Sequence, residues 1–158
     1  NEFEDCGFGV IVIDDTQQLL VHQNRIHGCS VGLLAAFTTS ATTFLNNTVT
    51  DCLEGITLQG STDTQVLNNT LEGVEYGIYL FQGATGAKVF INSLVGAPAS
   101  STDLAIGIGG SSFNKLVNNS YSDYSLDIFI DATSEENTIN LGGSSPNIVD
   151  NSPSTIYH

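Results

Sequence analysis

The chain has 158 residues, the length of one domain. Its 3 Lys and Arg residues against 17 Asp and Glu residues give a formal net charge of −14, which argues against a nucleic-acid partner because phosphate contacts need basic side chains. The same charge argues against anchoring on an anionic membrane surface. No apolar run approaches the roughly 18 residues of a membrane span, so we expect no membrane insertion.

A repeat of about 23 residues runs along the chain from its first residue. Three cysteines share this period (Cys6, Cys29 and Cys52), and so do the glycines at positions 9, 32, 55 and 77. A period in this range indicates a solenoid. Six asparagines, called the ladder asparagines below, follow one another in steps of 23, 23, 22, 23 and 27 residues: Asn1, Asn24, Asn47, Asn69, Asn92 and Asn119.

Within each repeat, apolar residues alternate with polar ones over three short pieces joined by Gly, Asn, Ser and Thr. The segments 55–58 (Gly-Ile-Thr-Leu) and 77–80 (Gly-Ile-Tyr-Leu) are examples. This local period of two predicts strands. One unit of three short strands cannot close its own core, but stacked units can. We therefore predict an all-β protein, a right-handed parallel β-helix of about six coils over residues 1–142. Ladder asparagines would tolerate left-handed turns and hydrogen-bond up the stack.

The repeat is interrupted once and then stops. From Asn92 to Gly107 there are 15 residues, where other coils have 8, so we predict a seven-residue loop insertion within 97–105. Gly142 falls where the next ladder asparagine is due, and we predict that 143–158 is an irregular tail capping the last coil. Asn1 already occupies a ladder position, so we expect coils or a cap before it. Three tail residues are expected to be tucked in: Ile148, Ile156 and Tyr157.

The stretch from Asn46 to Leu58 (Asn-Asn-Thr-Val-Thr-Asp-Cys-Leu-Glu-Gly-Ile-Thr-Leu) resembles the repeats of NosD-like and pectate-lyase-like parallel β-helix proteins. The resemblance covers about residues 1–142 and implies their fold. Such families include polysaccharide lyases, glycoside hydrolases, alginate epimerases, surface adhesins and phage tailspikes. The fold alone therefore does not select an activity.

Four acids of adjacent coils are the candidate catalytic residues, because stacking should gather them at one edge. A glycosidase needs two carboxyl groups about 5–5.5 Å or about 6.5–9.5 Å apart, and a coil spacing of about 4.8 Å allows either. The same oxygens suit Ca²⁺, and the third alternative is a solvated acidic edge. We expect no other cofactor. The four acids are Asp51, Glu54, Glu72 and Glu75.

Several outward positions are apolar and fall in columns, which indicates an interface rather than isolated exposed side chains. The partner would be carbohydrate or another subunit or domain, and a homo-oligomer is one form of this. A register error would instead turn some of these residues inward. Along the Gly-Ile strands the residues are Ile11, Ile13, Leu34, Tyr79, Phe81 and Phe129, and along the neighbouring strands they are Leu45, Leu67, Phe90 and Val117.

The cysteines occupy one inward position in three successive coils. A straight column offers neither four ligands nor tetrahedral geometry, so we predict no metal site and interpret the column as small apolar side chains. A disulfide within it would fit the coil spacing and leave one cysteine unpaired. His22, Arg25 and His27 flank a ladder asparagine and are interpreted as surface residues without a special role.

Two functions follow from these patterns. The favoured one is a non-catalytic segment of an extracellular, cell-surface or virion-surface protein, a rigid scaffold that binds carbohydrate or a partner. The alternative is a glycan-cleaving hydrolase that uses paired carboxylates. Polyuronate lysis is disfavoured, because the chain has only 3 Lys and Arg residues and its negative charge would repel a polyanion.

Overall fold

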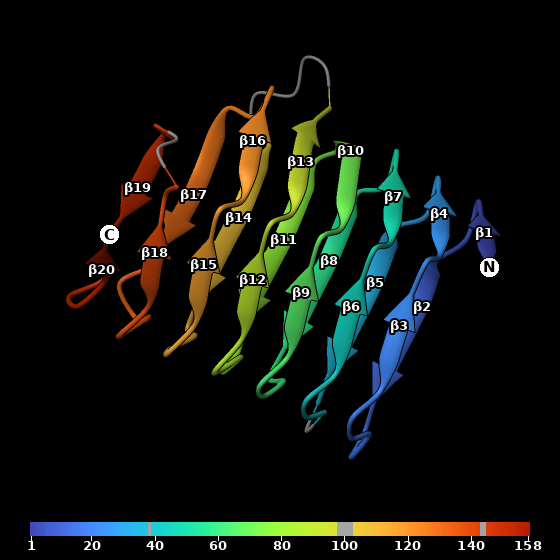
Figure 1. Ribbon diagram of the computed structural model, residues 1–158, viewed down its shortest axis with the longest axis horizontal. Helices are drawn as coiled ribbons and strands as arrows, with labels where there is room; N and C mark the ends of the chain where they lie inside the picture. The colour runs from blue at the N-terminus through green and yellow to red at the C-terminus, as the bar shows by residue number, and fades with distance from the viewer. Residues whose placement is uncertain (38, 98–102, 143–144) are drawn as a thin grey trace.

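The computed structural model describes residues 1–37, 39–97, 103–142 and 145–158. In these ranges the chain winds into stacked coils with three parallel sheets and no helix (Figure 1). Each strand pairs with its equivalents in the neighbouring coils, and the six strands of the first sheet mark six coils. The predicted parallel β-helix is confirmed. The described part of the chain contains no helix that could cross a membrane.

The three sheets run along the whole stack, one strand from each coil. The first sheet contains β1 (Glu2–Glu4), β4 (Arg25–His27), β7 (Thr48–Thr50), β10 (Thr70–Val74), β13 (Ser93–Gly96) and β16 (Ser120–Ser122). The second contains β2 (Phe8–Ile13), β5 (Val31–Ala36), β8 (Glu54–Gln59), β11 (Tyr76–Phe81), β14 (Leu104–Gly109), β17 (Leu126–Ile130) and β19 (Ile148–Asp150). The third contains β3 (Leu20–His22), β6 (Thr43–Leu45), β9 (Gln65–Leu67), β12 (Lys88–Phe90), β15 (Lys115–Val117), β18 (Thr138–Asn140) and β20 (Ile156–Tyr157).

The core consists of inward-facing columns, because alternate residues of a strand point to opposite faces of its sheet. The columns follow the register of the strands, so equivalent apolar residues stack directly on one another. Five consecutive residues of the central column of the second sheet are at most 1% exposed: Leu33, Ile56, Ile78, Ile106 and Ile128. The third sheet adds Val21, Phe44, Val66, Val89 and Leu116, and the first adds Ile26, Val49, Leu71 and Leu94.

The ladder asparagines form a vertical file, as predicted, but the left-handed conformation expected of them is wrong, because the residue before each interior ladder asparagine adopts it instead. From Asn1 to Asn92, the side-chain amide nitrogen of each ladder asparagine donates to the amide oxygen of the next at 2.9–3.0 Å. A second, shorter ladder was not predicted: the backbone nitrogen of Asn114 donates to Asn137 Oδ1 at 3.0 Å. Earlier coils place Thr42, Thr64 and Ala87 at this second position, so no asparagine period reveals it.

Corners between the sheets use the left-handed backbone conformation, which Asn and Asp tolerate better than other non-glycine residues. Asn46, Asn68 and Asn118, each directly before a ladder asparagine, have φ of 54°, 51° and 52°. Their backbone nitrogens donate to the third-sheet strand of the following coil. Ile91 occupies the same place in the intervening coil with φ 57°, which is unfavourable for a β-branched residue.

The predicted insertion was wrong in length. The spacing in the sequence places Gly107 level with Gly77. In the structure, Gly107 pairs with Tyr79, and Ile106 pairs with Ile78. The insertion is therefore two residues shorter than predicted. The error arose because Gly107-Ile108 has the same two residues as Gly77-Ile78, whereas the structural equivalent of Gly77-Ile78 is Ala105-Ile106. Residues 98–102 of the insertion lie outside the described residues.

The tail also differs from the prediction. It is irregular only in part: β19 pairs with β17 and β20 with β18, so two short strands of the tail cover the open edges of the last full strands. Ile148 packs against the core as expected. Ile156 and Tyr157 were expected to be tucked in, but they are 52% and 43% exposed. The backbone N–H and C=O groups at the open edge of β18 need hydrogen-bond partners, and the tail supplies them by forming a strand there.

Candidate functional site

The outer face of the second sheet carries aligned apolar columns. The six residues predicted for this surface all point outward. Ile11 and Ile13 are exposed, whereas the other four are half-buried. One column follows the register from Leu34 through Thr57, Tyr79 and Gly107 to Phe129. The neighbouring third sheet turns its own predicted residues outward as half-buried side chains (Leu45, Leu67, Phe90 and Val117).

This face is hollowed by a groove of about 310 Å³, lined by Glu54, Tyr76, Tyr79, Leu104 and Phe129. The groove spans four coils, because Glu54 pairs with Tyr76, Tyr76 with Leu104, and Leu104 with Leu126 of the strand that carries Phe129. Aromatic side chains from two of the coils therefore line one depression that also contains a carboxylate.

Gly107 gives the groove its shape. A Cβ atom at Gly107 would lie 2.5 Å from the Tyr79 ring and 2.9 Å from Leu104. The absence of a side chain therefore lets the Tyr79 ring lean across β14. The same ring stacks on Phe81, with centroids 5.0 Å apart and planes inclined by 15°. Tyr79 is held by neighbours on two sides, so its ring is preorganised as a flat surface.

Glu54 is also held in place. Thr57, three residues further along β8, donates a hydrogen bond from its Oγ1 to Glu54 Oε2 at 2.6 Å. Thr57 is only 3% exposed, so its hydroxyl is a fixed donor. The carboxylate is thus oriented beside the Tyr76 and Tyr79 rings, where it can accept hydrogen bonds from a ligand hydroxyl.

The four candidate acids flank the corner between the first and second sheets, but they face different directions. Glu54 lies on the outer face of the second sheet, whereas Glu72 is exposed on the first, level with Thr50. Asp51 lies in the corner itself with φ 52°. Glu75 lies in the corner one coil later and is half-buried. Only Glu54 lines the groove, and a catalytic role for the set stays a prediction.

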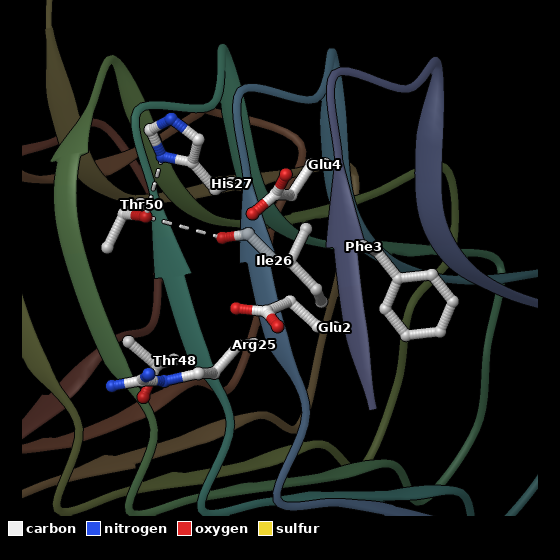
Figure 2. A pocket seen from close by; sticks show the side chains of 8 residues that line it. All are labelled: Glu2, Phe3, Glu4, Arg25, Ile26, His27, Thr48 and Thr50. Atoms are coloured by element: carbon white, nitrogen blue, oxygen red, sulfur yellow. Dashed lines mark hydrogen bonds between the residues drawn. The ribbon is translucent and has the colours of Figure 1, made fainter.

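A second pocket, of about 220 Å³, opens on the first sheet near the N-terminus (Figure 2). Glu2 and Glu4 project from one side of β1 while Phe3 projects from the other (Figure 2). Strand register places Glu2 level with Arg25, and Glu4 level with His27. Thr48 and Thr50 continue the same two rows in the third coil.

His27 contacts two polar side chains at this second pocket. Its Nδ1 lies 3.1 Å from Thr50 Oγ1 and 3.3 Å from Asp51 Oδ2. Both partners of the ion pair are more than half exposed, so the pair contributes little to stability. Arg25 and His27, interpreted from the sequence as surface residues without a special role, both line this pocket. Arg25 lies one residue after its ladder asparagine, as Glu2 and Thr48 do, and His27 lies three residues after it, as Glu4 and Thr50 do. These equal offsets are the signal in the sequence that could have identified the pocket.

The cysteine column contains a disulfide between Cys6 and Cys29, while Cys52 is free and buried. Within residues 1–37, 39–97, 103–142 and 145–158, no group of three or more His, Cys, Asp and Glu residues is placed to hold a metal ion. Calcium stays a prediction for the acidic corner, because calcium also takes carbonyl oxygens. His22 lies on β3 of the third sheet, away from the second pocket.

Comparison with known proteins gives two matches. The model of one family, described as "Periplasmic copper-binding protein (NosD)", matches residues 1–103. Among solved structures, the chain is similar to the crystal structure of DFA-IIIase from Arthrobacter chlorophenolicus A6 without its lid. The TM-score is 0.59 and the identity 12%, over 98% of this chain and 54% of that chain. This chain thus spans about half the length of that structure, and the likeness concerns the fold alone. No curated protein matches the chain.

Proposed function

The chain belongs to the NosD family, and from this premise we propose that it is a non-catalytic β-helix scaffold that binds carbohydrate in the groove of the second sheet. The observation that carries the proposal is the combination of half-buried rings with one oriented carboxylate. Tyr76, Tyr79 and Phe129 offer flat apolar surface, and Glu54 offers a fixed acceptor. Ligand sites typically combine aromatic walls with a few well-placed polar groups.

The charge of the chain narrows the class of glycan. With a formal net charge of −14, the protein repels polyanions at long range. The groove itself is lined by one acid and no basic residue. We therefore expect neutral sugars, whose hydroxyl groups donate to Glu54 and whose apolar faces stack on the rings, rather than uronates or sulfated chains.

Hydrolysis of the glycan is less well supported than binding. Retaining and inverting glycosidases both need a pair of carboxyl groups on either side of the scissile bond. The lining of the groove contains Glu54 as its one acid. Glu72 faces outward from the other sheet, and Asp51 is paired with His27. The geometry therefore favours a binding module over the glycan-cleaving alternative.

Copper, which the family description names, does not fit the residues of this chain. Soft thioether and thiolate ligands and imidazoles are the side chains that bind copper. The sequence has no Met, and two of its 3 Cys residues form the disulfide. No three candidate ligands come together among the described residues. We assign no copper-dependent step to this chain.

The location proposed for the chain is the periplasm or another compartment outside the cytoplasm. The description of the family as periplasmic supports this, and so does the disulfide between Cys6 and Cys29, because disulfides persist in oxidising compartments. Nothing supports a virion surface.

Binding is tested with the purified chain on an array of neutral and anionic glycans, followed by calorimetric titration of the neutral ligands that bind. Tyr79→Ala should weaken binding by about tenfold, because loss of one aromatic contact costs about 1.4 kcal/mol. Phe113→Ala is the matched control, since Phe113 is 60% exposed and lies outside the groove. Unchanged affinity of Tyr79→Ala would refute the assignment.

The same material distinguishes a glycan site from a subunit interface. Sedimentation of the wild-type chain should show a monomer whose mass does not depend on concentration. A dimer that Tyr79→Ala dissociates would show instead that the apolar face joins two copies of the chain, and the carbohydrate proposal would then fail.

A further inference from the structure

The three cysteines form an evenly spaced column in which one is left unpaired. Cys6 and Cys29 are joined by a disulfide with a Cα–Cα distance of 4.6 Å. Cys52 follows one coil later, is free, and is 3% exposed. The sequence separation is 23 residues in both steps. Cys29 therefore has a neighbouring cysteine on either side along the axis of the solenoid.

The backbone on the two sides of Cys29 has the same register. The backbone nitrogen of Ser30 donates to Cys6 O at 3.0 Å, and that of Leu53 donates to Cys29 O at 3.3 Å. These bonds repeat one ladder contact in consecutive coils. In addition, the backbone nitrogen of Cys29 lies 3.4 Å from Cys52 Sγ. A bridge from Cys29 to Cys52 thus requires the same step between coils as the bridge that is present, and that step suits a disulfide.

We propose that the column is a thiol–disulfide exchange site in which the bridge moves one coil inward and releases Cys6. The Cys52 thiolate attacks Cys29 Sγ, a Cys29–Cys52 bond forms, and the Cys6–Cys29 bond breaks. The electron pair of the broken bond leaves on Cys6, which takes up the proton that Cys52 gave up. One thiol and one disulfide are present both before and after the step, so there is no net oxidation and no oxidant or reductant is consumed.

Burial makes the thiols of Cys52 and Cys6, at the two ends of the column, differ in reactivity. Burial raises the pKa of the Cys52 thiol, and the nearby charge of Asp51 raises it further, although backbone hydrogen bonds with Cys29 and Gly28 oppose this. The thiolate is therefore scarce near neutral pH, and exchange is slow. The thiol released at Cys6 is half-buried in the first coil, where solvent can reach it. The exchange converts a hidden thiol into one that small thiol reagents and disulfide-bearing partners can modify.

The bridge is mapped in the wild-type chain, so the main test needs no variant. Trypsin cleaves after Arg25 and endoproteinase Asp-N cleaves before Asp51, which places the three cysteines in three different peptides. After incubation at neutral to mildly alkaline pH and acid quenching, mass spectrometry should detect both Cys6–Cys29 and Cys29–Cys52 peptides. Detection of the Cys6–Cys29 peptide alone at every time would overturn the proposal.

Alkylation of the native protein gives the second readout. Iodoacetamide should label Cys6 slowly in the wild type, and this labelling should be lost completely in Cys52→Ser, which has no attacking thiol. Far-UV circular dichroism verifies that the variant is folded. Labelling confined to Cys52 in the wild type, or equal labelling of Cys6 in both proteins, would show that the bridge does not move.

Discussion

Replacement of Asn47 by Ala tests whether the ladder asparagines hold the coils together. Asn47 is 1% exposed, and its side chain takes part in four hydrogen bonds. Its Oδ1 accepts from the backbone nitrogen and the Nδ2 of Asn24 at 3.1 and 2.9 Å, and its Nδ2 donates to Val21 O and Asn69 Oδ1 at 3.0 Å each. All four bonds are lost in Asn47→Ala.

The expected cost follows from what the partners can still reach. Asn24 Nδ2 keeps His22 O at 3.1 Å, and Asn69 Oδ1 keeps the backbone nitrogen of residue 47 at 2.9 Å. The Asn24 backbone nitrogen loses the acceptor that the asparagine supplied, whereas Val21 O lies in the ladder between β3 and β6 and loses only a second donor. A buried polar group without a partner costs about 1–3 kcal/mol, and a weakened hydrogen bond costs less than that, so one such group and three weakened bonds give about 4 kcal/mol. This is a large part of the 5–15 kcal/mol typical of a domain.

Urea unfolding followed by far-UV circular dichroism measures this loss as a lower midpoint. Asn1→Ala is the matched control, because Asn1 is exposed and its side chain donates one ladder bond, to Asn24 Oδ1 at 2.9 Å. It should lose about 1 kcal/mol or less. Equal losses in the two variants would show that the ladder bonds of the interior contribute no more than surface bonds, and would refute the reasoning.

Three further substitutions test the packing, the corners and the acid response. Gly55→Ala should destabilise by about 1–3 kcal/mol through overpacking, because its Cβ would lie 2.5 Å from Gly77 O, whereas Gly7→Ala, which meets nothing within 4 Å, should leave the urea midpoint unchanged or slightly raised. Ile91→Asn should raise the free energy of unfolding by about 1 kcal/mol, since the backbone of Ile91 is in the left-handed conformation and the residue is 61% exposed; a lower thermal midpoint would contradict this. Burial tends to raise the pKa of Asp131, but hydrogen bonds from neighbouring hydroxyl and backbone groups outweigh it and lower the pKa. The resulting stabilisation is complete above about pH 4 and is lost as pH falls through the lowered value, so Asp131→Asn should lose less stability than the wild type on acid titration, and parallel acid curves would count against it.

The repeat was readable in the sequence because stacking makes equivalent residues touch. A parallel coil places residue i on the residue one period later, so one buried position demands similar side chains at every step. Ile56 and Ile78 illustrate this for the core, and Asn47 and Asn69 for the ladder. Their spacing therefore contained both the fold and the register of the first four coils.

Where a position tolerates different residues, the spacing carried less information. Gly107 was aligned with Gly77 because both precede Ile, although Ala105 takes that place in the structure. The C-terminal strand of Ile156 and Tyr157 was missed because edge pairing needs backbone groups rather than a side-chain pattern. Local motifs were ambiguous in both cases, and only the hydrogen-bonding of neighbouring coils resolved them.

The amino-acid sequence by itself determined the solenoid, its period, its ladder and the outward direction of residues such as Tyr79 and Phe129. Tertiary structure alone decided which outward residues share a groove, which acid lines it, and which two cysteines are joined. The physical reason is that a period specifies which residues stack along the axis, whereas a groove depends on side-chain direction around a coil. The lean of Tyr79 over the missing Cβ of Gly107 arises only when the coils are in place.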